Sequence, residues 1–70
     1  MTHVFVKNSG YYDVYHCNTV VFIPVGDILE IANIPGNRES KDYYVCKYGR
    51  LYVKIECNNC EAGTLKVSGL

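Results

Sequence analysis

The sequence predicts a small all-β domain whose short antiparallel strands curl into a barrel. Turn signals divide the 70 residues into short runs rich in Val, Ile, Tyr and Phe, which is the composition of strands. No stretch repeats apolar residues at helical spacing over enough length to predict a helix. Roughly five or six short strands cannot cover both faces of an open sheet, so residues 1–70 are expected to form one barrel-like domain.

Turn residues place the expected strands along the chain. The cluster Asn8-Ser9-Gly10 predicts a turn that pairs the first strand with the second. Pro24 indicates an edge or a bend, because proline cannot donate a ladder hydrogen bond. Residues 34–41 hold Pro, Gly and polar side chains, which predicts a mobile, exposed loop. The expected strands cover residues 3–7, 11–17, 19–25, 28–33, 42–48, 50–57 and 64–67.

Alternation of side chains divides the expected strands into two faces. In the first pair of strands, Val4 and Val6 are expected beside Val14 and Tyr12. The central hairpin, hinged near Tyr48-Gly49, is expected to point one set of side chains toward the core and the other outward. The expected inner set is Tyr44, Cys46, Leu51, Val53, Ile55 and Cys57. The expected outer set is Tyr43, Val45, Lys47, Arg50, Tyr52, Lys54 and Glu56.

Composition limits the class of protein. Hydrophobic residues make up 49% of the chain and charged residues 20%, which excludes a disordered chain. Seven Lys and Arg balance seven Asp and Glu, so no overall field attracts nucleic acid or an anionic membrane. The longest apolar stretch, 20–25, is too short to span a bilayer, and the first residues lack a signal-peptide pattern. We therefore expect a cytoplasmic protein without membrane contact, whose cysteines are thiols or metal ligands.

Three short motifs resemble the SH3-like barrel family. They are Val21-Phe22-Ile23-Pro24-Val25-Gly26-Asp27-Ile28-Leu29-Glu30-Ile31, Tyr12-Asp13-Val14-Tyr15 and the aromatic pair Tyr43-Tyr44. The likeness covers residues 11–56 and implies an SH3-like barrel, with an OB-like barrel or a small sandwich as alternatives. The chain lacks the Trp of that family's peptide groove, carries a longer loop over 34–42, and has Cys57-Asn58-Asn59-Cys60 where the family has a Pro-containing turn. The resemblance therefore does not imply recognition of proline-rich peptides.

The cysteines allow two main interpretations. Cys57 and Cys60 have the spacing with which two thiolates chelate zinc from a tight turn, and His16 with Cys17 would complete the site, Cys46 being a substitute ligand. The interpretation that the sequence favours is that Cys46 and Cys57 are small hydrophobic core residues and that Cys57 and Cys60 flank a turn. A redox pair is a third alternative, although the chain lacks the βαβ context of that motif. Zinc is the one cofactor that the sequence suggests.

Seven tyrosines in so short a chain indicate a recognition surface, since Tyr is enriched at interfaces. An ordinary half-exposed sheet face is an equally weighted alternative, because Tyr is also a good strand former. Aromatic and basic side chains also alternate on the outer hairpin face, as single-stranded nucleic-acid binding requires. A solvated face with lysines is the favoured alternative there. The candidate binding residues are Tyr11, Tyr15, Tyr43, Lys47, Arg50, Tyr52 and Lys54.

No catalytic motif is present, so a non-enzyme is expected. The leading hypothesis is a non-catalytic module that docks on a partner protein and inhibits or modulates it. In size and style the chain resembles the compact accessory proteins of bacteriophages or mobile elements. The alternatives are a zinc-stabilised nucleic-acid-binding barrel and a structural subunit whose strand edges drive homo-oligomers.

Overall fold

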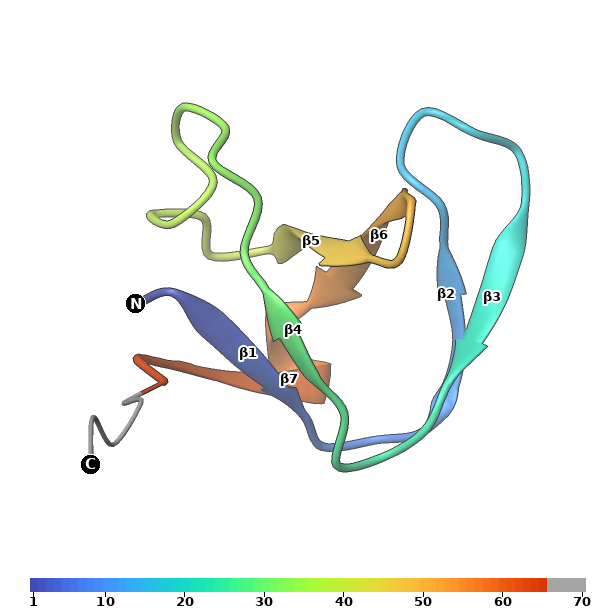
Figure 1. Ribbon diagram of the computed structural model, residues 1–70, viewed down its shortest axis with the longest axis horizontal. Coiled ribbons are helices and arrows are strands. Elements are labelled where there is room, and N and C mark those ends of the chain that lie inside the picture. Colours follow the sequence, from blue (N-terminus) through green and yellow to red (C-terminus); the bar gives the residue numbers. More distant parts are fainter. Residues whose placement is uncertain (66–70) are drawn as a thin grey trace.

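The computed structural model describes residues 1–65 and confirms the all-β class (Figure 1). The described part contains seven strands, one 3₁₀ turn and no α-helix. It also offers no helical segment with the length and hydropathy that a bilayer crossing requires. The elements are β1 (His3–Val6), β2 (Gly10–Asp13), β3 (Val20–Ile23), β4 (Ile28–Glu30), β5 (Tyr43–Tyr48), β6 (Leu51–Glu56), the turn η1 (Cys57–Asn59) and β7 (Cys60–Gly63).

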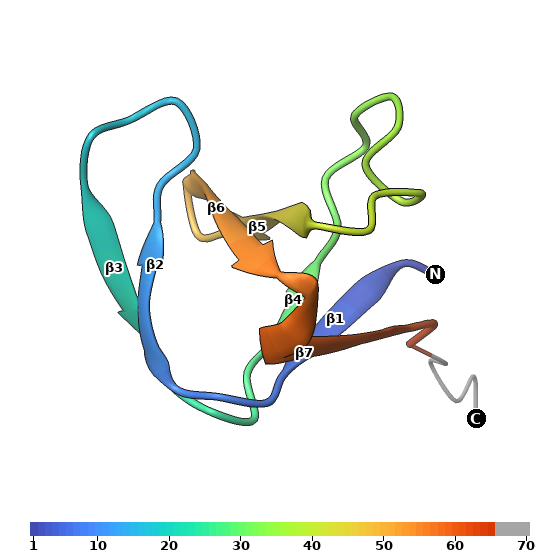
Figure 2. The ribbon, with the colours of Figure 1, turned by 180° about the vertical axis from the view of Figure 1, so that it is seen from behind.

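The strands form three small antiparallel sheets (Figures 1 and 2). β1 lies between β4 and β7, β2 pairs with β3, and β5 pairs with β6. Single bridges link the sheets in series: Ile31 with Cys46 joins the first sheet to β5, and Val53 with Val14 joins β6 to the end of β2. Among residues 1–65 the strand ladder does not close, so the closed barrel expected from the strand count is not formed.

The predicted first hairpin is wrong, because β1 pairs with β4 and β7 rather than with β2. The segment after β1 is held by distant residues: the Lys7 N–H donates to the Asn59 carbonyl at 2.8 Å and the Asn8 side chain donates to that of Asn59 at 2.9 Å. These contacts draw residues 7–8 toward η1 and separate β1 from β2. The predicted face nevertheless holds, since Val4, Val6, Tyr12 and Val14 are all buried in one core.

Several strands are shorter than predicted or displaced. β2 ends at Asp13 and the chain turns at His16, whose φ is +57°, so residues 14–17 do not extend the strand. β7 begins directly after η1, because the Cys60 N–H bonds to the Cys57 carbonyl and closes a tight turn. The last strand is therefore 60–63 rather than 64–67. Residues 64 and 65 lie outside any strand, and 66–67 lie outside the described residues.

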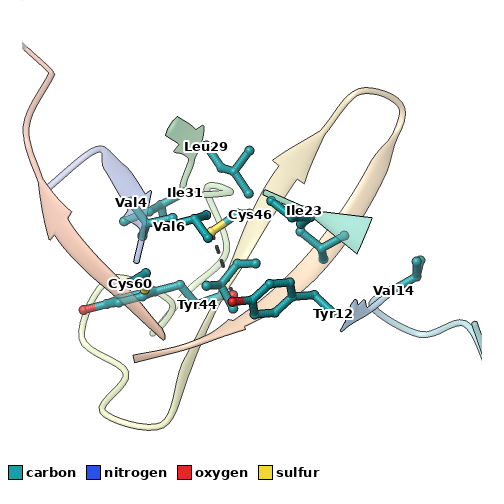
Figure 3. Close-up of a cluster of buried hydrophobic side chains, with 12 residues drawn as sticks. Val4, Val6, Tyr12, Val14, Ile23, Leu29, Ile31, Tyr44, Cys46 and Cys60 are labelled. Atoms are coloured by element: carbon teal, nitrogen blue, oxygen red, sulfur yellow. Dashed lines mark hydrogen bonds between the residues drawn. The ribbon is translucent and has the colours of Figure 1, made fainter. Parts of the chain in front are cut away.

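Each of the seven strands contributes at least one side chain to the core. Figure 3 shows these buried side chains gathered in one cluster. Four members of the predicted inner hairpin face are buried: Tyr44, Cys46, Val53 and Ile55. The prediction is wrong for Leu51, which is 42% exposed because it borders the hairpin turn, and Cys57 is only half-buried. The remaining core members are Val4, Val6, Tyr12, Val14, Ile23, Leu29, Ile31 and Cys60.

The loop between β4 and β5 is exposed over most of its length, as predicted, but Asn37 within it is buried. Asn37 is 7% exposed, and its amide donates to the carbonyls of Ala32 at 2.7 Å and Val45 at 2.8 Å. Its Oδ1 accepts a 2.9 Å bond from the Val45 N–H. The Asn37 side chain thus acts as an extra peptide group along the edge of β5. The loop covers Val45, which is 4% exposed although the alternation predicts it outward.

Candidate functional site

The seven predicted binding residues divide between two neighbouring hollows and one turn. A cleft of about 180 Å³ lies between β2 and the β5–β6 hairpin and is lined by three of them, Tyr11, Tyr43 and Lys54. A second hollow, beside residues 32–34, is lined by Tyr15, Lys47 and Tyr52. Arg50 lies in the turn between β5 and β6. The structure thus brings the predicted residues to one region of the molecule but not into one pocket.

The most exposed aromatic side chains of this region belong to the β2–β3 hairpin. Tyr11 is 74% exposed and Phe22 51% exposed, and they are directly paired across the strands. Their rings meet edge to face, with centroids 5.5 Å apart and an interplanar angle of 68°. Val20, 50% exposed, lies two residues before Phe22 on the same face of β3. The sequence does not single out Phe22 and Val20, because an uninterrupted apolar run over 20–23 does not indicate which face is exposed.

Lys54 and Tyr43 interact within the cleft. The Lys54 ammonium lies 4.5 Å from the centroid of the Tyr43 ring, a cation–π geometry. The strand register places Tyr43 opposite Glu56 and Val45 opposite Lys54, so Lys54 reaches Tyr43 diagonally across the two strands. The Lys54 ammonium therefore lies over the face of the Tyr43 ring inside the cleft.

Carboxylates dominate the charge of this cleft. Asp13, Asp42 and Glu56 line it, against the single cation Lys54. The one ion pair among residues 1–65 joins Lys47 to Glu30 at 3.4 Å, so none of the cleft carboxylates is paired with a basic side chain there. Lys47, which the sequence suggested as a phosphate contact, is occupied by that pair. The outer hairpin face is accordingly less basic than the alternation of its residues suggests.

Backbone contacts position Tyr15 beside β6. The Tyr15 N–H donates to the Tyr52 carbonyl at 2.7 Å, next to the bridge between Val14 and Val53. The Tyr15 and His16 rings lie 3.9 Å apart between centroids at an angle of 48°. The connection between β2 and β3 is thereby fixed over the hairpin, where it forms one wall of the second hollow.

The four cysteines are free thiols in different surroundings. Cys17 is exposed in the connection between β2 and β3, whereas Cys57 and Cys60 bracket η1 at a different part of the fold (Figure 1). The half-buried Cys57 donates to the Ser40 carbonyl at 3.8 Å, and the buried Cys60 to the Glu56 carbonyl at 3.5 Å. Within residues 1–65 no three His, Cys, Asp or Glu side chains gather as a metal site would require. The proposed zinc ligands His16, Cys17, Cys57 and Cys60 are therefore not brought together.

Burial keeps two of these thiols protonated. Desolvation raises the pKa of Cys46 to about 12, with a smaller contribution from nearby Cys60. Desolvation, with the neighbouring Cys57 adding to it and Lys7 opposing it, raises the pKa of Cys60 to about 11. Desolvation also raises the pKa values of the buried hydroxyls of Tyr12 and Tyr44. A nucleophile or a metal ligand requires the thiolate, so Cys46 and Cys60 are suited to packing rather than to reaction.

The chain was compared with models of protein families, with curated proteins and with solved structures, and none of them matches it. Its function must therefore be argued from the geometry of its own side chains.

Proposed function

We propose that this protein is a non-catalytic protein-binding module that modulates a partner by occupying part of its surface. The docking face consists of the exposed aromatic pair on the β2–β3 hairpin and the adjoining cleft and hollow. Its members are Tyr11, Tyr15, Phe22, Tyr43, Tyr52 and Lys54. The observation that carries the proposal is the exposed Tyr11–Phe22 pair beside the cleft.

The exposed aromatic pair offers a partner apolar surface that the fold leaves in water. A Phe or Tyr side chain buries a large apolar area and gains about 1.5–3 kcal/mol when it leaves water. Phe22 and Tyr11 keep about half and three-quarters of their surfaces exposed, and the domain core forms without them. Aromatic side chains are also enriched among the residues that dominate binding energy at interfaces. These properties support a docking role for the hairpin.

We further propose that the fold is a variant of the SH3-like type. The sequence motifs over 11–56 support this, as does the arrangement of β1 between the last strand and β4, with a central β5–β6 hairpin. Cys57-Asn58-Asn59-Cys60 occupies the region where that family's Pro-containing turn would lie, and the chain has no Trp for a peptide groove. We accordingly propose a ligand other than a proline-rich peptide.

Charge favours a protein partner over a nucleic acid. Phosphate binding requires free basic side chains, and affinity depends strongly on their number. Lys47 is paired with Glu30, and Lys54 shares its cleft with three carboxylates.

The buried neutral thiols of Cys46 and Cys60 fit a reducing compartment, so we propose that the protein acts in the cytoplasm.

Partner capture with matched surface variants tests this proposal. The double variant Tyr11→Ser/Phe22→Ser removes the exposed pair, and Ile28→Ser removes a side chain of similar exposure (50%) from β4. We expect immobilised wild-type protein and Ile28→Ser to retain the same lysate protein, and the double variant to bind it at least about 10-fold more weakly. Circular dichroism and melting confirm that each variant is folded. Equal retention by all three proteins, or no specific retention by any, contradicts the proposal.

A further inference from the structure

We propose that the partner presents an arginine side chain to the cleft between β2 and β5–β6, and that Lys54 occupies the place of that side chain in the free protein. This inference rests on the proposed docking function and specifies the chemistry of the partner. The cleft residues that carry it are Tyr11, Asp13, Asp42, Tyr43, Lys54 and Glu56.

Charge complementarity selects a cationic occupant. Asp13 comes from β2, Asp42 immediately precedes β5, and Glu56 ends β6, so acidic side chains line the cleft from separate elements. All three residues are exposed, and none forms an ion pair with a basic side chain among residues 1–65. An anionic or neutral partner segment would leave them unpaired, and an anion would also meet their repulsion. A basic segment pairs with them.

The position of Lys54 indicates where the cation binds. Its ammonium lies 4.5 Å from the Tyr43 ring centroid and has no carboxylate within ion-pair distance among the described residues. An aromatic face attracts any cation that reaches it, whether the cation belongs to this chain or to a partner. The free protein thus already fills the ring face of Tyr43 with its own weakly held cation.

Arginine fits this place better than lysine. The guanidinium group is planar, stacks on aromatic faces and can bind a carboxylate with two parallel hydrogen bonds. Tyr43 offers the face, while Glu56 lies opposite Tyr43 in the strand register and Asp42 precedes it in the chain. A guanidinium over Tyr43 can therefore contact the ring and an adjacent carboxylate together, whereas Lys54 contacts the ring without forming an ion pair.

Displacement of Lys54 has a measurable consequence. An entering arginine must break the interaction between Lys54 and Tyr43, so that interaction opposes binding. Its removal in Lys54→Met should strengthen binding of an arginine peptide by about two- to fivefold, the range expected for an exposed cation–π contact. Lys47→Met is the matched control. It removes one positive charge from the same face of the hairpin, but Lys47 is paired with Glu30 outside the cleft.

The test is an NMR titration of the isotope-labelled full chain with three blocked peptides: hexa-arginine, hexa-lysine and hexa-glutamate. We expect hexa-arginine to bind most tightly, hexa-lysine more weakly and hexa-glutamate not at all, with shifts concentrated at Tyr11, Asp13, Asp42, Tyr43 and Glu56. The substitutions Asp13→Asn and Glu56→Gln should each weaken hexa-arginine binding about threefold. Glu39→Gln, an exposed carboxylate in the β4–β5 loop, should leave it unchanged.

Three outcomes overturn the inference: shifts spread over the whole surface, hexa-glutamate binding as well as hexa-arginine, or Lys54→Met changing affinity no more than Lys47→Met. The docking function has a separate readout, because partner capture depends on Tyr11 and Phe22. Capture that is lost in the Tyr11→Ser/Phe22→Ser variant, combined with no localised hexa-arginine binding, rejects the arginine inference alone. Equal capture by the wild type, by Ile28→Ser and by Tyr11→Ser/Phe22→Ser rejects the docking function itself.

Discussion

Replacement of Asn37 by alanine should destabilise the fold strongly, although Asn37 lies in a loop. The Asn37 side chain makes three hydrogen bonds, of 2.7, 2.8 and 2.9 Å, to the backbone of residues 32 and 45. The two carbonyls retain other partners, because Ala32 accepts from the Ile34 N–H and Val45 accepts from the Ala32 N–H. The Val45 N–H, in contrast, loses its acceptor while Val45 stays buried.

The magnitude follows from these bonds. A net contribution of about 1 kcal/mol per hydrogen bond gives about 3 kcal/mol for the Asn37 side chain. A buried N–H left without a partner costs about 1–3 kcal/mol, which overlaps with this sum rather than adding to it in full. A loss of about 3 kcal/mol is a large fraction of the 5–15 kcal/mol that stabilises a typical domain, and should lower Tm by at least about 12 °C.

Urea unfolding followed by tyrosine fluorescence or circular dichroism measures this effect. Asn33→Ala is the matched control, because Asn33 lies in the same loop but is exposed. We expect Asn37→Ala to lower the free energy of unfolding by about 3 kcal/mol and Asn33→Ala by less than about 0.5 kcal/mol. If the two variants agree within error, the hydrogen bonds of Asn37 do not hold the loop on β5, and the reasoning fails.

Three further predictions concern the core and the cysteines. Ile55→Ala, at a fully buried position, should lower the free energy of unfolding by about 2–5 kcal/mol in the same urea assay. Ile28→Ala, at an exposed position, should lower it by less than about 0.5 kcal/mol, and equal losses in the two variants would contradict the assigned core. Burial raises the pKa of Cys46 to about 12 and that of Cys60 to about 11, whereas an unfolded thiol has a pKa of roughly 8.5. The contribution of these two thiols to stability is therefore complete below about pH 8.5 and is lost as the pH rises toward the pKa values of the folded protein. Cys60→Ala should reduce this alkaline fall in the urea midpoint, and an unchanged profile in Cys60→Ala would refute the assignment. Chelator should change neither the native mass nor Tm, because the described residues gather no metal-binding cluster, and a metal-dependent rise in Tm would contradict this arrangement.

Local patterns in the sequence predict the central hairpin well. The period of two along residues 43–48 and 51–56 correctly places Tyr44, Cys46, Val53 and Ile55 in the core. That period survives small errors in the turn, because a hairpin fixes both faces once its two strands pair. The same pattern directs Tyr43, Lys54 and Glu56 outward, so part of the cleft is predictable before its other wall is known.

The pairing of β1 and the burial of Asn37 could not be predicted in this way. The pairing of β1 joins segments far apart in the chain, as Val6 with Cys60. The burial of Asn37 depends on hydrogen bonds to Ala32 and Val45, which lie five and eight residues away but follow no strand or helix periodicity. Asn8-Ser9-Gly10 has the composition of a hairpin turn, yet the bonds of Lys7 and Asn8 to Asn59 prevail over that local preference. A polar loop likewise gives no sign that one of its amides will pair with strand backbone.

The β4–β5 loop connects stability with the proposed docking face. It buries Val45 in the middle of the outer hairpin face and leaves Tyr43 and Lys54 partly exposed beside it. The same loop holds the start of β5, since the Ser40 hydroxyl oxygen accepts from the N–H groups of Asp42 and Tyr43 at 3.4 Å. Detachment of the loop would expose Val45 and release the residues that line the cleft. Asn37→Ala should therefore weaken partner binding even at temperatures where the domain remains folded. Ile55→Ala, measured at a temperature where it too is folded, should bind the partner with unchanged affinity.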